Sequence, residues 1–111
     1  MSWKLPPPKP VLDIKKVENG LVLSWNMNAE LSQHAKIASY QLYAYQESSH
    51  TVPSSSVWKK VGDMKALTLP MACTLTQFKK GNKYHFAIRS VDIHSRVGQF
   101  SNPSKFLLTQ N

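Results

Sequence analysis

The sequence has a single cysteine and lacks the signals that mark exported and membrane proteins. Cys73 has no second cysteine to pair with, so no disulfide can form within the chain. No apolar run reaches the roughly 18 residues that a membrane span needs, and no signal-peptide stretch follows the first residues. In Asn102-Pro103-Ser104 the proline blocks glycosylation. An intracellular, reducing location fits best, with a fragment of a secreted protein as the alternative.

The residue types that catalysis or metal binding would use are scattered. Zinc needs several ligands at close spacing, whereas the four histidines fall in different segments, at positions 34, 50, 85 and 94. The carboxylates show no pairing that would divide acid and base roles, and the four glycines form no phosphate loop. Cys73 is expected to be a small buried hydrophobic residue. We therefore expect no cofactor, no metal site and no enzyme activity.

The formal net charge of +8 raises the question of nucleic-acid binding, because clustered lysines attract a phosphate backbone. The lysines fall in small groups, and only Arg89 and Arg96 offer the fork that reads guanine edges. Solvated strand edges and turns explain most of these charges. We expect no specific nucleic-acid binding. The alternative is a basic domain that tethers its parent protein to nucleic acid non-specifically through Lys79, Lys80 and Lys83.

The length of 111 residues, with 41% hydrophobic and 18% charged residues, is typical of one folded domain. Pro6, Pro7 and Pro8 remove backbone donors, so residues 1–9 are predicted to form an extended, proline-rich lead-in that acts as a linker. Trp3 is expected to pack loosely within it. The domain is expected over residues 10–109, with residues 110–111 as a tail. The lead-in suggests a terminal piece of a longer protein.

From Pro10 onward apolar and polar residues alternate with a period of two, which is typical of half-buried strands. Strands are predicted at 11–17, 21–25, 37–46, 57–62, 66–75, 83–91 and 104–109. Asn19 and Gly20 suit a hairpin turn with positive φ, and Pro70 suits an edge strand. Strands of this number and spacing predict an all-β fold, an antiparallel immunoglobulin-like sandwich.

Three motifs in this order resemble the fibronectin type III family over residues 10–109. They are Trp25 on the second strand, the run Ile37-Ala38-Ser39-Tyr40-Gln41-Leu42 on the third, and a tyrosine corner at residues 78–84 that ends in Tyr84. The runs at 38–45, 58–62 and 69–78 are further similar to the C-terminal domain of the activating transcription factor 7-interacting proteins. Within that family the second, shorter member is the better match.

This resemblance implies a nuclear cofactor of transcriptional repression that supports heterochromatin formation and gene silencing. In the family this domain is a protein-interaction module that binds short motifs in methyl-CpG-binding domain protein 1 and related chromatin repressors. Another region of the full-length protein engages a histone-lysine methyltransferase. We expect a nuclear monomer without membrane attachment.

The tyrosine-corner match sets the register, so strand alternation sorts the side chains into two faces. The predicted core residues are Trp25, Tyr40, Leu42, Tyr84, Phe86 and Ile88. The predicted partner-binding residues on the outer face are Tyr43, Tyr45, Trp58, Ala87 and Arg89. We predict a shallow groove that binds a short hydrophobic peptide, with Arg89 pairing to acidic flanks. The alternatives are cross-strand aromatic pairs that serve stability alone and a purely structural spacer.

Overall fold

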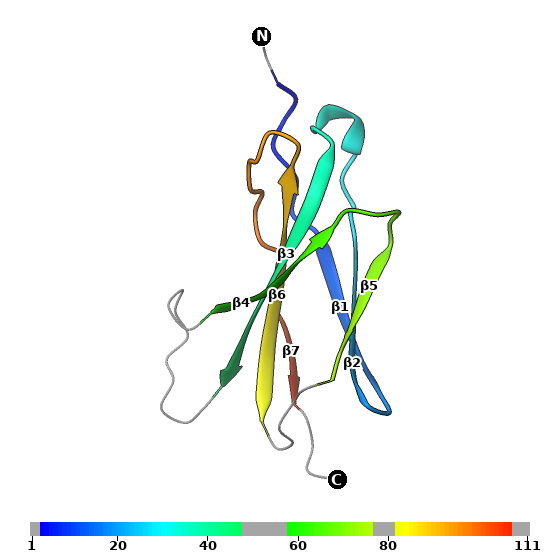
Figure 1. Ribbon diagram of the computed structural model, residues 1–111, viewed down its shortest axis with the longest axis vertical. Helices are drawn as coiled ribbons and strands as arrows, with labels where there is room; N and C mark the ends of the chain where they lie inside the picture. Colours follow the sequence, from blue (N-terminus) through cyan, green and yellow to red (C-terminus); the bar gives the residue numbers. More distant parts are fainter. Residues whose placement is uncertain (1–2, 48–57, 77–81, 108–111) are drawn as a thin grey trace.

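The computed structural model describes residues 3–47, 58–76 and 82–107, and its regular elements are almost entirely strands (Figure 1). The strands are β1 (Val11–Val17), β2 (Gly20–Asn26), β3 (Ile37–Glu47), β4 (Lys59–Lys65), β5 (Met71–Leu75), β6 (Lys83–Asp92) and β7 (Ser104–Leu107). One short 3-10 turn, η1 (Leu31–Gln33), lies between β2 and β3. Within these three ranges no helix has the length and apolar character to cross a membrane.

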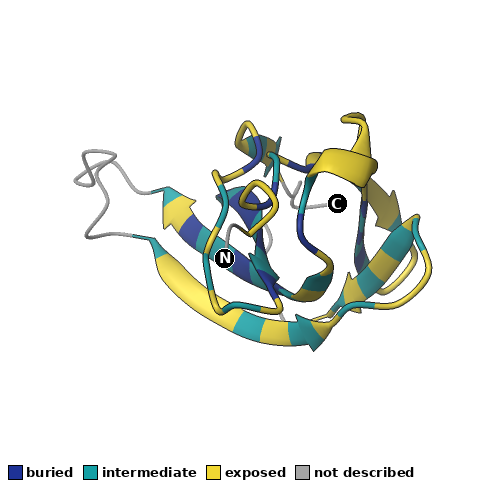
Figure 2. Ribbon diagram, turned by 90° about the horizontal axis from the view of Figure 1, so that it is seen from above, coloured by how far each residue is buried: buried dark blue, intermediate teal, exposed yellow. Residues whose placement is uncertain are grey.

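The seven strands form two antiparallel sheets that face each other. One sheet has the order β1-β2-β5 and the other β4-β3-β6-β7. Buried residues alternate with more exposed ones along β2 and much of β3, and buried segments appear among more exposed ones in the strands seen from above (Figure 2). The predicted all-β sandwich is therefore confirmed.

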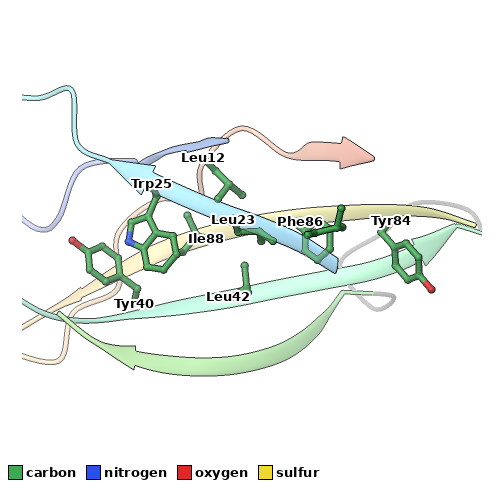
Figure 3. Packing of buried hydrophobic residues seen from close by; sticks show 9 residues of the cluster. Leu12, Leu23, Trp25, Tyr40, Leu42, Tyr84, Phe86 and Ile88 are labelled. Carbon is green, nitrogen blue, oxygen red and sulfur yellow. The ribbon is translucent and has the colours of Figure 1, made fainter. Parts of the chain in front are cut away.

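The core lies between the sheets and contains all six residues that the register predicted for it (Figure 3). Trp25, Tyr40 and Leu42 are each 1% exposed. The rings of Trp25 and Tyr40 meet edge to face at 5.5 Å. The indole nitrogen of Trp25 is buried without a hydrogen-bond partner, and Figure 3 shows it on the side of the indole that faces Tyr40.

The β1–β2 hairpin forms as predicted, but its glycine has a different purpose. Val17 pairs with Gly20 across the turn, and neither Asn19 nor Gly20 has positive φ; Ser95, at 63°, is the only described non-glycine residue that does. A Cβ on Gly20 would lie 2.2 Å from the carbonyl oxygen of Leu75 on β5. Gly20 is thus required by a close approach of two backbones.

The limits of two strands, β4 and β5, differ from the prediction. The difference lies where the chain passes from one sheet to the other. β4 begins at Lys59, after Trp58, and continues to Lys65. The chain then crosses to the other sheet over residues 66–70, so the predicted strand 66–75 is wrong in its first half. Pro70 has no N–H for a ladder and lies just before β5, which is an edge strand as expected.

Several predictions fall on residues outside the described ranges. Residues 77–81 cover most of the predicted tyrosine corner and include Lys79 and Lys80. Residues 48–57 and 108–111 include the beginning of the predicted fourth strand and the end of the last one. Tyr84, at the other end of the corner, is buried in the core at 8% exposure.

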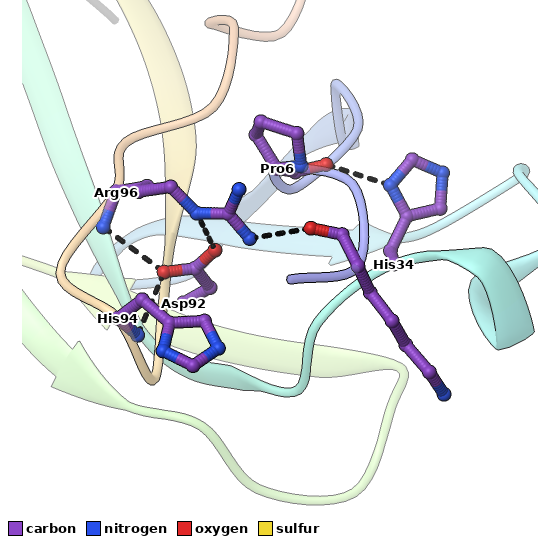
Figure 4. Close-up of polar contacts among 6 residues, drawn as sticks. Pro6, His34, Asp92, His94 and Arg96 are labelled. Atoms are coloured by element: carbon purple, nitrogen blue, oxygen red, sulfur yellow. Dashed lines mark hydrogen bonds and ion pairs between the residues drawn. The ribbon is translucent and has the colours of Figure 1, made fainter. Parts of the chain in front are cut away.

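The lead-in is extended and lies against the domain. The amide of Leu5 donates to the carbonyl of Gln33, and the amide of Ala35 donates to the carbonyl of Leu5, each at 3.0 Å. His34 Nδ1 lies 2.6 Å from the carbonyl oxygen of Pro6 (Figure 4). Pro7 is buried. Residues 5–7 are therefore held on the sandwich rather than free of it.

Candidate interaction surface

The pairing of β3 with β6 gathers the predicted site residues on the outer face of the four-stranded sheet. Gln41 pairs with Arg89, Tyr43 with Ala87, and Tyr45 with His85. Because alternate residues of a strand share a face, these three pairs form a ladder on one side of the sheet. The core residues of β3 and β6 point to the other side.

The guanidinium of Arg89 organises one end of this ladder. Arg89 Nε donates to Gln41 Oε1 at 2.7 Å, and Arg89 Nη2 donates to the hydroxyl of Tyr43 at 3.3 Å. The same guanidinium lies over the ring of Tyr43 at 5.3 Å and over the ring of Phe100 at 4.7 Å. Tyr43 and Phe100 meet edge to face at 5.1 Å. Arg89 is thus fixed between two rings by cation–π contacts and hydrogen bonds.

Three further rings meet at the other end of the ladder. Tyr45 meets Trp58 edge to face at 4.7 Å and stacks on His85 at 4.3 Å. His85 Nε2 lies 3.2 Å from Glu47 Oε1, and Lys83 Nζ lies 3.8 Å from the other oxygen of Glu47. We call the surface formed by Tyr43, Tyr45, Trp58, Arg89 and Phe100 the outer aromatic face.

The outer aromatic face is packed more closely than the predicted groove. Tyr45 is only 8% exposed and Ala87 only 4%, because the rings of Trp58 and His85 lie against Tyr45 and Tyr43 pairs directly beside Ala87. Tyr43, Trp58 and Arg89 are half-buried. A ligand would therefore meet the edges of these side chains, with Tyr45 and Ala87 as support beneath.

Phe100 is the residue of this surface that sequence reasoning missed. It comes from the loop between β6 and β7 and is 37% exposed. Its neighbour Ser101 anchors the loop, since its amide donates to the carbonyl of Ile88 at 2.7 Å and its hydroxyl accepts from the amide of Ile88 at 3.0 Å. The available signal was that Phe100 is an apolar residue in a polar loop. Loop residues follow no strand periodicity, so the sequence did not predict its contact with Tyr43 on β3.

A second polar cluster joins the loop after β6 to the lead-in (Figure 4). Asp92 Oδ1 accepts from the amides of His94 and Arg96, each at 2.9 Å, and Asp92 Oδ2 pairs with Arg96 Nε at 2.8 Å. Arg96 Nη2 donates to the carbonyl of Lys4 at 2.7 Å. Trp3 stacks on His94 at 4.0 Å and lies under the Arg96 guanidinium. Both oxygens of the Asp92 carboxylate have partners within the domain, which indicates a structural role for this carboxylate.

The pKa of Asp92 lies below its ordinary value. Burial alone would raise this pKa, because a buried carboxylate loses its hydration. The amides of Arg96 and His94 and the guanidinium of Arg96 stabilise the ionised form and outweigh burial. Asp92 is thus a charged group of the folded interior at neutral pH.

Cys73 shows the features of a packing residue. It lies half-buried on β5 against the core, and burial raises the pKa of its thiol, which disfavours the nucleophilic thiolate. Within the part of the chain that the structure describes, no three His, Cys, Asp or Glu side chains come together in a way that would hold a metal ion.

Comparison with known proteins identifies relatives over most of the chain. The model of the fibronectin-III type domain matches residues 5–105. The chain is 53% identical over 100 residues to human activating transcription factor 7-interacting protein 1, and 45% identical over 98 residues to human activating transcription factor 7-interacting protein 2. These matches cover 87% and 86% of this chain but only 8% and 14% of the two relatives.

The predicted family resemblance is thus confirmed. Between these two human relatives, however, identity is higher with protein 1, the reverse of the order that the motifs indicated. Among solved structures, the third fibronectin III domain of human KIAA0343 protein superposes with a TM-score of 0.70 at 15% identity. It covers 99% of this chain and 88% of that chain. Identity this low supports the fold alone.

Proposed function

Since the chain belongs to the fibronectin type III domain family, we propose that it is a protein-interaction module of a nuclear transcription cofactor. Its closely similar relatives are named for their interaction with activating transcription factor 7. The module binds a hydrophobic linear motif in chromatin-associated repressors such as methyl-CpG-binding domain protein 1. It thereby supports heterochromatin formation and gene silencing, while other regions of the full-length protein engage a histone-lysine methyltransferase.

The observation that carries the proposal is the outer aromatic face. Aromatic side chains and arginine are the residues that most often dominate binding energy at protein interfaces, and here β3, β6, the residue before β4 and the β6–β7 loop bring them together. The Arg89 fork uses two donors on Gln41 and Tyr43 out of the five that a guanidinium carries. The remaining donors face an acidic flank of the motif. The proposal assigns the domain no catalytic step.

The basic-domain alternative has less support on the described surface. Lys83 pairs with Glu47 and Lys60 pairs with Asp63, which reduces the positive field near these lysines. The two alternatives differ in salt dependence. Nucleic-acid binding through several phosphates falls steeply with salt, whereas a hydrophobic motif on an aromatic surface is nearly indifferent to it.

An NMR titration with peptides from the repression region of methyl-CpG-binding domain protein 1 tests the proposal. We expect saturable amide shifts centred on Tyr43, Tyr45 and Arg89, and little change between low and moderate salt. Saturable shifts on another surface would keep the partner and move the site. Shifts that appear only with nucleic acid and vanish with salt would contradict the proposal.

Two substitutions separate binding from folding. Tyr43→Ala and Arg89→Glu are each expected to weaken peptide binding about tenfold or more, because hot-spot side chains contribute about 2 kcal/mol or more. Their thermal midpoints should fall only modestly, because each variant also loses contacts with Phe100 while the core stays intact. Val11→Ala and Lys15→Glu, on β1 of the other sheet, are the matched controls. Equal loss of stability and binding in the outer-face variants would contradict the surface assignment.

A further inference from the structure

A pocket of about 220 Å³ lies at one end of the sandwich, between the β2–β3 connection and the β4–β5 connection. We call it the end pocket; its lining includes Leu31, His34, Lys36, Tyr40, Leu67 and Leu69. A cavity of roughly 150 Å³ is enough for a benzene ring, whereas small-molecule sites usually measure about 300–1,000 Å³. The end pocket therefore has the size for one large side chain and is small for a drug-sized ligand.

The wall of the end pocket includes Tyr40, whose hydroxyl makes no hydrogen bond with the described residues. Tyr40 is 1% exposed, and none of the hydrogen bonds within the described part of the chain involves its hydroxyl. Figure 3 shows this oxygen at the end of the ring that points away from Leu42 and the rest of the core. Burial raises the pKa of Tyr40, so the hydroxyl stays protonated and can donate. The hydroxyl is not one of the fully buried polar atoms that lack a partner, so it is open to the end pocket, where a ligand acceptor can take the place of solvent.

The rim of the end pocket is apolar and positively charged. Leu31 and Leu67 are 37% and 67% exposed, so their side chains add apolar surface to the rim. Lys36 is exposed, and no carboxylate belongs to the described lining. The nearest acid along the chain, Glu30, accepts a hydrogen bond from the amide of Ser32 at 3.0 Å. Lys36, the one Lys or Arg side chain of that lining, favours an acidic group in a ligand.

We propose that the end pocket is a second peptide-binding site, which takes one leucine- or phenylalanine-sized side chain from an acidic segment of a partner protein. The apolar side chain fills the pocket between Leu31, Leu67 and Leu69. Tyr40 donates to a carbonyl oxygen of the bound segment, and Lys36 attracts its flanking carboxylates. The inference does not depend on the outer aromatic face, which is a separate surface on β3 and β6.

The probe is a blocked five-residue peptide with leucine at its centre and two glutamates on each side, titrated into the full chain by NMR. We expect saturable shifts at the amides of Lys36, Ile37 and Leu67. Replacing the central leucine by alanine should weaken binding about tenfold, because most of the buried apolar area is lost. Replacing the glutamates by lysines should abolish it.

Two pairs of variants test the assigned groups. Tyr40→Phe should bind the leucine peptide about five- to tenfold more weakly, which corresponds to one hydrogen bond, while Tyr43→Phe on the outer face should bind it unchanged. Lys36→Glu should reduce binding, and Lys15→Glu, with the same change in net charge, should reduce it less. Tyr40→Phe should be as stable as the parent chain or slightly more so, since an unpaired hydroxyl is removed.

Three outcomes would overturn the inference. The first is equal binding of the leucine and alanine peptides, and the second is binding by Tyr40→Phe as tight as that of the parent chain. The third is a set of shifts centred on Tyr43 and Arg89. The last result would leave the proposed function of the outer aromatic face intact. If Tyr40→Phe proved markedly less stable, the hydroxyl would serve the fold, which would also contradict its assignment to a ligand.

Discussion

Asp92 illustrates how much of this domain one side chain connects. Its carboxylate accepts from two backbone amides of the β6–β7 loop and pairs with Arg96, which in turn donates to the carbonyl of Lys4. The side chain of Asp92 is fully buried and that of Arg96 is 26% exposed. Because every oxygen of the carboxylate has a partner, its burial is compensated.

Asp92→Asn should lower the free energy of unfolding by about 1–3 kcal/mol at pH 7, since charge-assisted hydrogen bonds are the stronger ones. The folded-state pKa of Asp92 is below the value of about 3.9 in an unfolded chain. Its contribution is therefore complete above about pH 4 and is lost as pH falls through the folded-state pKa. Urea denaturation of both proteins from pH 7 to pH 2.5 measures this. A difference between the two proteins that stays constant down to the lowest pH would refute the assignment.

At the scale of elements, the contact between β2 and β5 depends on a position without a side chain. The hairpin end of β2 approaches the end of β5 so closely that a Cβ on Gly20 would meet backbone atoms of Leu75 and Thr76. Backbone atoms cannot move aside as a flexible side chain can, so the strands would have to separate. At Gly62 on β4, by contrast, a Cβ would meet nothing within 4 Å.

Gly20→Ala is accordingly expected to destabilise the domain by about 2 kcal/mol or more. Gly62→Ala should change stability by less than about 0.5 kcal/mol or raise it slightly, since alanine restricts the unfolded chain. Chemical denaturation of both variants provides a matched comparison of the same substitution in two strands. Similar effects at the two positions would show that the β2–β5 approach is not as close as the structure has it.

At the scale of the whole molecule, the lead-in ties the beginning of the chain to distant segments. Leu5 bonds to the end of η1 and to the residues just after it. Lys4 bonds to Arg96, and Lys9 Nζ donates to Asn102 at 2.9 Å. A Cβ on Gly98 would lie 2.4 Å from the carbonyl oxygen of Pro7. The lead-in and the β6–β7 loop therefore pack against each other.

Deletion of residues 1–9 should lower the free energy of unfolding by about 2–4 kcal/mol, at about 1 kcal/mol for each of several hydrogen bonds. Gly98→Ala should destabilise the full chain, because it displaces Pro7, but should have little effect in the truncated chain. This non-additivity, measured by a double-mutant cycle, identifies the direct contact. Additive effects would show that the lead-in and Gly98 act independently.

The outer aromatic face shows how far sequence reasoning reached in the candidate site. Alternation along β3 and β6 placed Tyr43, Tyr45 and Arg89 on one face. Alternate residues of a strand share a face, so this can be read from the sequence of each strand alone. It did not reveal that Tyr45 and Ala87 are covered, since burial depends on the rings that neighbouring segments bring. The strand limits near Pro70 were also wrong, because the chain leaves one sheet for the other there.

The sequence by itself determined the all-β sandwich, the faces of its long strands and its membership of the fibronectin type III family. These follow from hydrophobic period, turn residues and motif order, all of which are local along the chain. Only the tertiary structure decided that Phe100 contacts Tyr43, that the backbone of Leu75 leaves no room for a side chain at position 20, and that the Tyr40 hydroxyl faces a pocket. Such contacts join residues that are far apart in the chain. They depend on the paths of loops and on how closely two backbones approach, and no local sequence pattern encodes either.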